Sequence, residues 1–251
     1  MRCITIFFLL FIFLILPTPP VFAVEDAHAI IQKVDERQSV TTSWSELSML
    51  VYPEADDTEN VREFRLVTYG KGDDDTYVEF LSPRSIRGLK LLSKGDDQWI
   101  YFASTGRCRK ISSNAQSKRQ SVRGVGGDFS YEDLGGGKLQ EKYSFKLLES
   151  VDKEWVLEGT PKKAESVYAR IVILVQKESY LVNRIEYYTE EEGHYKDLIM
   201  EDVRSMGGRE IATRMTMLNH EKSSKTVMII HSARHNVPIN DKYFNPTRFY
   251  N

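Results

Sequence analysis

The chain has 251 residues, of which 41% are hydrophobic and 11% aromatic, and its 34 Lys and Arg nearly balance its 36 Asp and Glu. A nucleic-acid-binding protein would normally show a basic face and an excess of positive charge, and a peripheral membrane protein would show a cationic amphipathic helix. The formal net charge of −2 argues against both classes. The apolar content is sufficient for the core of one domain over residues 24–251.

Residues 1–23 have the pattern of a secretory signal peptide. A short basic start precedes an apolar run from Ile4 to Leu16, and Ala23 is the small residue that a signal peptidase prefers. A membrane-spanning helix needs about 20 apolar residues, and Pro17 ends this run earlier. We therefore expect cleavage after Ala23 and an exported protein, with an uncleaved N-terminal membrane anchor as the alternative.

Cysteine usage leaves no pair for a disulfide after this cleavage. Cys3 lies ahead of the apolar run, so Cys108 alone would remain in the exported chain. We interpret Cys108 as structural or incidental, because the sequence around it lacks the combination of basic residues and a histidine that would activate a thiol. The fold must then be stabilised by packing.

The periodicity of the chain changes near residue 40. Apolar residues recur at helical spacing over residues 27–38, which predicts a helix. From residue 43 onward, short alternating segments separated by Gly- and Asp-rich turns predict antiparallel hairpins. The predicted strands include residues 63–69, 76–81, 87–93, 98–103, 141–150, 169–177, 181–189, 195–203, 210–219 and 225–234. About a dozen strands of this length should curl into a half-barrel, so we predict a mainly β (α+β) fold.

Residues 104–137 interrupt the alternation and are too many for an ordinary hairpin turn. Basic residues gather at the start of this segment, and Asp128 could cap a short helix through Leu134, with Phe129 turned inward. We interpret the segment as a helical lid or plug over one end of the sheet. A disordered basic surface loop is the alternative.

The histidines suggest no metal site. The closest pair in sequence, His231 and His235, lies on a predicted strand, where four residues span about 13 Å, too far for one ion. We expect surface or packing roles for all five histidines and predict no metal or cofactor. They are His28, His194, His220, His231 and His235.

Three carboxylates are near enough in sequence to form a pair for acid–base catalysis, namely Asp128, Glu132 and Asp133. Capping by Asp128, and ion pairs from the other two to the basic residues 107–110, explain them without chemistry. No phosphate-binding loop and no G-x-S-x-G elbow is present. We therefore predict a protein that is not an enzyme, with a hydrolase using these carboxylates as the alternative.

A curled sheet encloses an interior that every second residue of each strand must line. Val78 and Phe80 share one face of their strand, and Trp99 and Tyr101 share one face of theirs. The lining would be apolar, which suits either a hydrophobic ligand cavity or a filled core. Strand periodicity does not distinguish the two.

Four motifs and the chain ending resemble the outer membrane lipoprotein-sorting proteins of the LolA-like family. They are P-x-x-I-R-G-L-K-L-L at 83–92, D-Q-W-I-Y-F at 97–102, R-C-R-K-I-S at 107–112, G-G-D-F-S-Y-E-D-L at 126–134 and F-N-P at 244–246. The resemblance covers essentially all of the chain after the signal peptide.

The resemblance implies a half-barrel with a helical lid over a hydrophobic cavity, in a periplasmic protein that carries acyl chains between membranes. Relatives in this branch are often associated with resistance-nodulation-division type lipid exporters, so the implied cargo is a lipidated protein or a lipid. The implied partners are an inner-membrane lipid exporter and an outer-membrane acceptor. The alternatives are an envelope-stress sensor, an accessory protein of a lipid exporter, and a lipid hydrolase.

The same resemblance suggests two groups of binding residues. We expect contacts with cargo, in the cavity or lid, from Phe80, Trp99, Tyr101, Phe129, Tyr131 and Leu134. A second group would either meet an anionic headgroup or lock the lid, and it comprises Arg107, Arg109, Lys110, Asp128 and Asp133.

Overall fold

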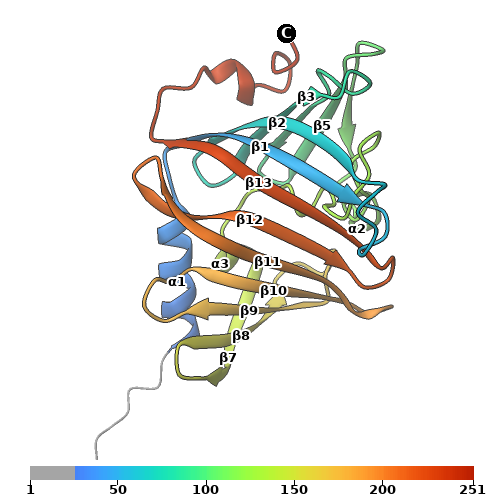
Figure 1. The fold of residues 1–251 in the computed structure, drawn as a ribbon. Coiled ribbons are helices and arrows are strands. Elements are labelled where there is room, and N and C mark those ends of the chain that lie inside the picture. Colours follow the sequence, from blue (N-terminus) through green and yellow to red (C-terminus); the bar gives the residue numbers. More distant parts are fainter. Residues whose placement is uncertain (1–25) are drawn as a thin grey trace, which may run out of the picture.

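One continuous antiparallel sheet of 13 strands dominates this computed structural model, which describes residues 26–251 (Figure 1). The sheet is strongly curled but does not close into a barrel, as predicted, and the two edge strands are β6 and β7. The expected signal peptide, residues 1–23, lies outside the described residues.

The first and last strands meet in the middle of the sheet, where β1 pairs with β13. The first half of the chain then runs outward to one edge through β1 (Thr42–Tyr52), β2 (Arg62–Lys71), β3 (Asp75–Ser82), β4 (Lys90–Lys94), β5 (Asp97–Phe102) and β6 (Arg107–Ile111). The second half starts at the other edge and returns to the middle through β7 (Tyr143–Ser150), β8 (Glu154–Pro161), β9 (Arg170–Gln176), β10 (Val182–Thr189), β11 (Gly193–Met206), β12 (Arg209–Asn219) and β13 (Ser224–His235).

Residues 26–251 contain four helices, of which only the first is longer than one turn. They are α1 (Ala27–Gln38), α2 (Ala115–Lys118), α3 (Leu139–Lys142) and the 3-10 helix η1 (Asp241–Phe244). The side chain of Asp26 caps α1 by accepting from the His28 N–H at 3.1 Å. Asp35 in α1 accepts from the backbone N–H groups of Leu139 and Gln140 at 2.9 and 3.0 Å, so α1 supplies the cap that α3 lacks.

Two apolar clusters fill the concave side of the sheet. One gathers side chains from β1 to β5, β12 and β13, and the other packs α1 against β8 and β9. Tyr187 in β10 contacts both clusters, which places them on the same side. The alternation of strand residues explains the lining, since Val78 and Phe80 face inward whereas Tyr77 faces outward.

The C-terminal segment covers part of the outer face, at the far end of the molecule from α1 (Figure 1). Phe244 and Phe249 are buried there against Tyr77 and Leu92. The ring of Tyr243 stacks on another outward aromatic, Tyr69, with the ring centroids 4.4 Å apart. The C-terminal residues therefore act as a third layer that keeps outward aromatic residues from water.

The predicted helix over residues 27–38 is confirmed with the same bounds. The predicted helix from Asp128 to Leu134 is wrong, because this stretch forms a bend at Asp128, an isolated β-bridge at Ser130 and a turn over residues 131–134. Residues 107–111, which we assigned to the interrupting segment, form the edge strand β6. The irregular segment between β6 and α3 therefore starts later than expected and spans residues 112–138.

Phe249→Ala tests the contribution of the outer layer to stability. Removing a buried aromatic ring leaves a cavity, so the free energy of unfolding should fall by about 3 kcal/mol in a urea titration. Arg248→Ala is the control, because Arg248 is exposed and its removal should change the free energy of unfolding by less than about 0.5 kcal/mol. Equal effects of the two substitutions would contradict a packed outer layer.

Candidate functional site

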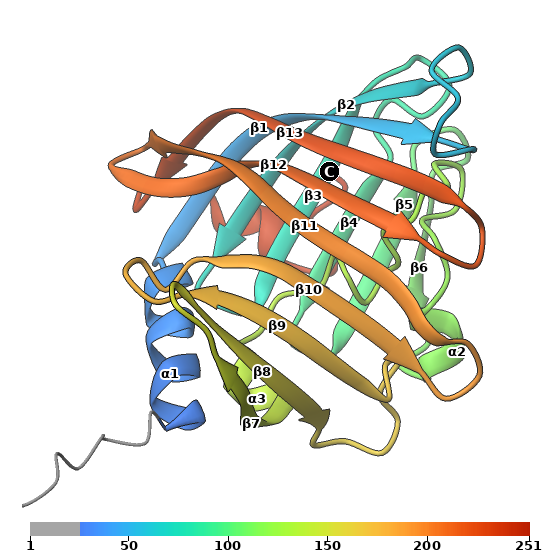
Figure 2. The same ribbon diagram turned by 60° about the horizontal axis from the view of Figure 1, so that its bottom comes forward.

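The connection between the two halves of the sheet crosses the concave face. Because β6 and β7 are opposite edges, residues 112–138 must pass from one edge to the other, and we call them the strap. Figure 2 shows the helix of the strap, α2, beside β6, and α3, which follows the strap, beside β8 on the other side. The topology itself therefore brings the strap over the interior of the half-barrel.

Apolar side chains of the strap fill this interior. Val122, Val125, Phe129 and Tyr131 are all buried, and they pack against a lining that comprises Leu47, Met49, Leu66, Phe80, Leu91, Ile100, Met217 and Met228. A void beside Tyr131 has a volume of about 10 Å³, which is room for about one water molecule. The core is thus filled, by a segment that enters from outside the sheet.

Asp128 fixes the middle of the strap to β13. Its buried carboxylate accepts hydrogen bonds from Ser224 Oγ at 2.6 Å and from Thr226 Oγ1 at 2.8 Å. The Asp128 N–H donates in turn to Thr226 Oγ1 at 2.9 Å. A buried carboxylate without such donors would be strongly destabilising, so these two hydroxyl groups are what allows Asp128 to lie here.

A buried ion pair fixes the end of the strap to β11. Lys196 Nζ lies 3.2 Å from Asp133 Oδ2, and each side chain is 2% exposed. Lys196 Nζ also donates to the carbonyl oxygen of Asp128 at 2.7 Å, so a single ammonium group holds both ends of the turn. Asp133 gains further donors from the Ser130 N–H at 2.7 Å and the Tyr168 hydroxyl at 2.5 Å.

The Tyr168 hydroxyl remains a donor because its environment opposes ionisation. Burial, and then the negative charge of Asp133, raise the pKa of Tyr168 well above its ordinary value. The hydrogen bond to Asp133 therefore persists at any physiological pH.

The strap approaches the sheet most closely at Gly127. Its φ of +82° lies in the left-handed region that favours glycine, and a Cβ here would lie 3.0 Å from Thr226 Oγ1 and 3.1 Å from Val51 Cγ2. A side chain at this position would push the strap away from β1 and β13.

Polar clefts flank the strap. One, of about 300 Å³, lies at its C-terminal end, where Lys118 and Lys142 lie 3.5 and 3.7 Å from Glu132 and Lys163 lies 2.6 Å from Asp96. A smaller one, of about 210 Å³, is lined by Arg62, Gly126, Asp128 and Lys222, among others. The apolar interior thus lies between two regions that contain charged side chains.

The aromatic residues expected at the cavity divide between the two faces of the sheet. Phe80, Phe129, Tyr131 and Leu134 lie together in the interior. Trp99 and Tyr101 instead lie on the outer face with the C-terminal segment, where Tyr101 stacks on Tyr250 at 5.2 Å. The prediction that Trp99 and Tyr101 line the interior together with Val78 is therefore wrong. In β5, Ile100 points inward, whereas Trp99 and Tyr101 point outward.

The basic residues expected to lock the lid lie on the edge strand β6. Arg107, Arg109 and Lys110 are exposed, and Lys110 pairs with Asp97 at 2.8 Å. The ion-pair partner of Asp133 is Lys196 in β11 and not one of these three residues. Cys108 in the same strand is half-buried, and burial raises the pKa of its thiol, which disfavours a reactive thiolate.

The residues that anchor the strap were missed in the sequence, although one signal was present. Lys196, Tyr168, Ser224 and Thr226 come from distant strands. Ser224 and Thr226 share the alternation of Met228, which predicts an inward direction for two hydroxyl groups. Polar residues at inward positions can indicate a buried acceptor.

A double-mutant cycle tests the ion pair. Asp133→Asn leaves the Lys196 ammonium buried with a single carbonyl, which should lower the free energy of unfolding by about 3 kcal/mol. Lys196→Met should cost less, because Asp133 keeps its donors from Ser130 and Tyr168. The double variant should be more stable than the sum predicts, by about 1 kcal/mol or more in urea titrations. Additive effects would contradict a direct coupling between the two groups.

Comparison with known proteins agrees with this architecture. A family model with the description "Uncharacterized protein" matches residues 72–250. No curated protein sequence matches the chain. Within residues 26–251, none of the helices has the length and apolar character needed to cross a bilayer.

Solved structures match over most of the chain. A DUF1329 family protein from Desulfovibrio piger is 26% identical with a TM-score of 0.76, and the match covers 87% of this chain and 95% of that one. A domain from Vibrio parahaemolyticus that is assigned to outer membrane lipoprotein sorting is 25% identical, also with a TM-score of 0.76, over 89% and 97% of the two chains.

A LolA superfamily protein from Nitrosomonas europaea shares the fold at 22% identity, with a TM-score of 0.71 and coverage of 87% of this chain and 97% of that one. The half-barrel, the motifs over residues 83–134 and these relatives agree with one another. The chain belongs to the family whose model matches residues 72–250, and its fold is that of the LolA-like proteins.

Proposed function

We propose that this protein is a periplasmic carrier that takes up the acyl chains of lipoproteins or lipids and transfers them towards the outer membrane. In this proposal, residues 1–23 are a signal peptide cleaved after Ala23, and residues 24–251 form one carrier domain. No catalytic step is involved. The observation that carries the proposal is that apolar side chains of the strap, such as Phe129 and Tyr131, are buried against the lining that the strands supply.

The strap can occupy the place of cargo because its apolar side chains come from one continuous segment. Val122, Val125, Phe129 and Tyr131 would leave the interior together, exposing a lining that belongs to the sheet. Each buried methylene of an acyl chain contributes roughly 0.8 kcal/mol, so a long chain can offset the loss of these four contacts. Transfer then needs no energy source within the protein.

The polar anchors of the strap suit reversible release. Asp128, Asp133 and Lys196 bind one another, hydroxyl groups and backbone atoms in the closed state. In an open state, water can replace these partners, so the anchors select one closed geometry without adding a large net stabilisation. The apolar contacts, which cargo can replace, would then decide whether the strap is in or out.

The flanking clefts suit the polar part of such cargo. Lys142 and Lys163 border the larger cleft next to the buried ring of Tyr143. An anionic headgroup or a polar peptide could lie here while its acyl chain enters the interior. We further propose an inner-membrane lipid exporter as donor and an outer-membrane acceptor as partners of this exchange.

The first experiment is a mass-spectrometric analysis of an organic extract from the natively purified protein. A carrier should retain a lipid or a lipopeptide in a near one-to-one ratio. A protein that is empty and also fails to bind acylated peptides would contradict the proposal.

Phe129→Ala tests whether strap and cargo compete for the interior. Burial of a Phe side chain contributes about 1.5 kcal/mol or more, so removing it from the closed state should strengthen binding of a fluorescent fatty acid by about tenfold. Tyr101→Ala is the matched control, because it removes an aromatic ring from the outer face and should leave affinity unchanged. Weaker binding by Phe129→Ala would indicate that the interior is a permanent core.

A further inference from the structure

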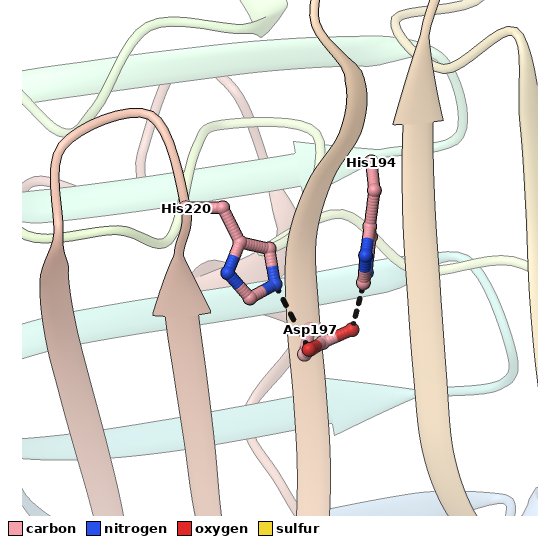
Figure 3. Close-up of side chains that lie close together, drawn as sticks. All are labelled: His194, Asp197 and His220. Carbon is pink, nitrogen blue, oxygen red and sulfur yellow. Dashed lines mark hydrogen bonds and ion pairs between the residues drawn. The ribbon is translucent and has the colours of Figure 1, made fainter.

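Two histidines and an aspartate meet in one cluster (Figure 3). Asp197 points to the outer face of the sheet, because its neighbours Lys196 and Leu198 contact the strap and the inner cluster. His194 Nε2 lies 2.8 Å from Asp197 Oδ1, and His220 Nε2 lies 2.9 Å from Asp197 Oδ2. Both rings turn toward the two oxygens of one carboxylate, as Figure 3 shows. The sequence argument had considered His231 and His235 as the closest pair and did not detect this arrangement.

A β-bulge brings His194 to this face. Tyr187 and Tyr188 are consecutive in β10, yet they pair with Lys196 and His194 in β11, so Tyr195 is an extra residue. In a regular strand, residues three positions apart point to opposite faces. The extra residue reverses this relation, so that His194 joins Asp197 on the outer face while Lys196, between them, points inward to the strap.

The two rings are held by contacts outside the cluster. His194 stacks on the ring of Tyr188, with centroids 4.9 Å apart and an angle of 20° between the planes. The Arg170 guanidinium covers the Tyr188 ring at 3.5 Å. His220 follows the last residue of β12, and its backbone N–H donates to the Tyr195 carbonyl at 3.0 Å, so the bulge also positions the second ring.

The three candidate ligand atoms have nearly the spacing that a metal ion requires. They all lie within 4.8 Å of one another, whereas ligands bound at about 2.0–2.2 Å around a tetrahedral ion lie about 3.3 Å apart. Asp197 is 3% exposed, but the side chains of His194 and His220 are 36% and 41% exposed. The half-exposed rings can therefore move toward an ion from solvent without disturbing the core.

Arg184 occupies part of the carboxylate in the present structure. Its Nη2 lies 2.8 Å from Asp197 Oδ2, and its Nε lies 3.3 Å from Glu186 Oε1. Glu186 can retain this guanidinium when a cation takes over the carboxylate. Arg184 and His220 both contact Asp197 Oδ2, whereas His194 contacts Oδ1, so Oδ1 is the more accessible carboxylate ligand.

We propose that His194, Asp197 and His220 form a binding site for a divalent transition-metal ion, with Zn²⁺ as the representative. Imidazole nitrogen with one carboxylate oxygen suits Zn²⁺, Cu²⁺ or Ni²⁺, and disfavours Mg²⁺ and Ca²⁺, which prefer oxygen ligands alone. A histidine binds the ion through an Nε2 that carries no proton, and the neutral ring then has its one proton on Nδ1. Water completes the coordination on the solvent side. This site is independent of the proposed carrier function.

Titration calorimetry with ZnCl₂ tests the site on the full untagged protein after treatment with a chelator. We expect saturable binding of one ion per chain. Since loss of even an outer partner of a metal ligand lowers affinity by about tenfold or more, His194→Gln and His220→Gln should each weaken binding at least that much. His231→Gln is the control, because the His231 ring lies outside the cluster, 2.8 Å from Ser48 Oγ. This variant should bind Zn²⁺ with the affinity of the wild type.

The histidine variants should fold normally, because the side chains of His194 and His220 are half-exposed. Circular dichroism of each variant measures whether the fold is retained. Absence of saturable binding to the wild type would overturn the proposal and leave a hydrogen-bonded His–Asp–His cluster. Equal binding by the double variant His194→Gln/His220→Gln would overturn it too, since the ion would then be held elsewhere.

Discussion

The path of the chain between the two edges of the sheet is the constraint on which the rest of this structure depends. Strands β1 and β13 pair in the middle, so each half of the chain must run to its own edge, and residues 112–138 must connect edges that lie furthest apart in the strand order. In a flat sheet this connection would be long and exposed. Because the sheet curls, the short way across is through the interior. The path of the strap is therefore a consequence of the topology.

Because the strap crosses the interior, the interior must contain backbone and charged groups as well as apolar side chains. Strands satisfy their own hydrogen bonds, whereas an irregular segment does not, so its polar groups need partners from the sheet. Lys196, Ser224 and Thr226 supply them from β11 and β13. The apolar residues of the strap stabilise its position, and the polar ones determine which single position it takes.

The sequence predicted the regular part of this molecule well, because helix and strand periods are local. Residues 27–38 and the hairpins follow from spacing alone. The side of the sheet to which a strand face turns is not local, and so Trp99 and Tyr101 were placed inside although they lie under Phe249 and Tyr250. The pairing of Asp133 with Lys196 joins residues far apart in sequence, and the Tyr195 bulge depends on the register with β10. Neither leaves a pattern along the chain.

The open form of the sheet leaves β6 and β7 as edges in the described part of the chain, and unpaired edges are templates for edge-to-edge association. Arg107, Arg109 and Lys110 are exposed along β6, and a register irregularity between Leu147 and Glu149 distorts β7. A second copy adding to β6 would bring like charges together. The basic residues thus oppose polymerisation at the moment when a displaced strap would leave the half-barrel most prone to aggregate.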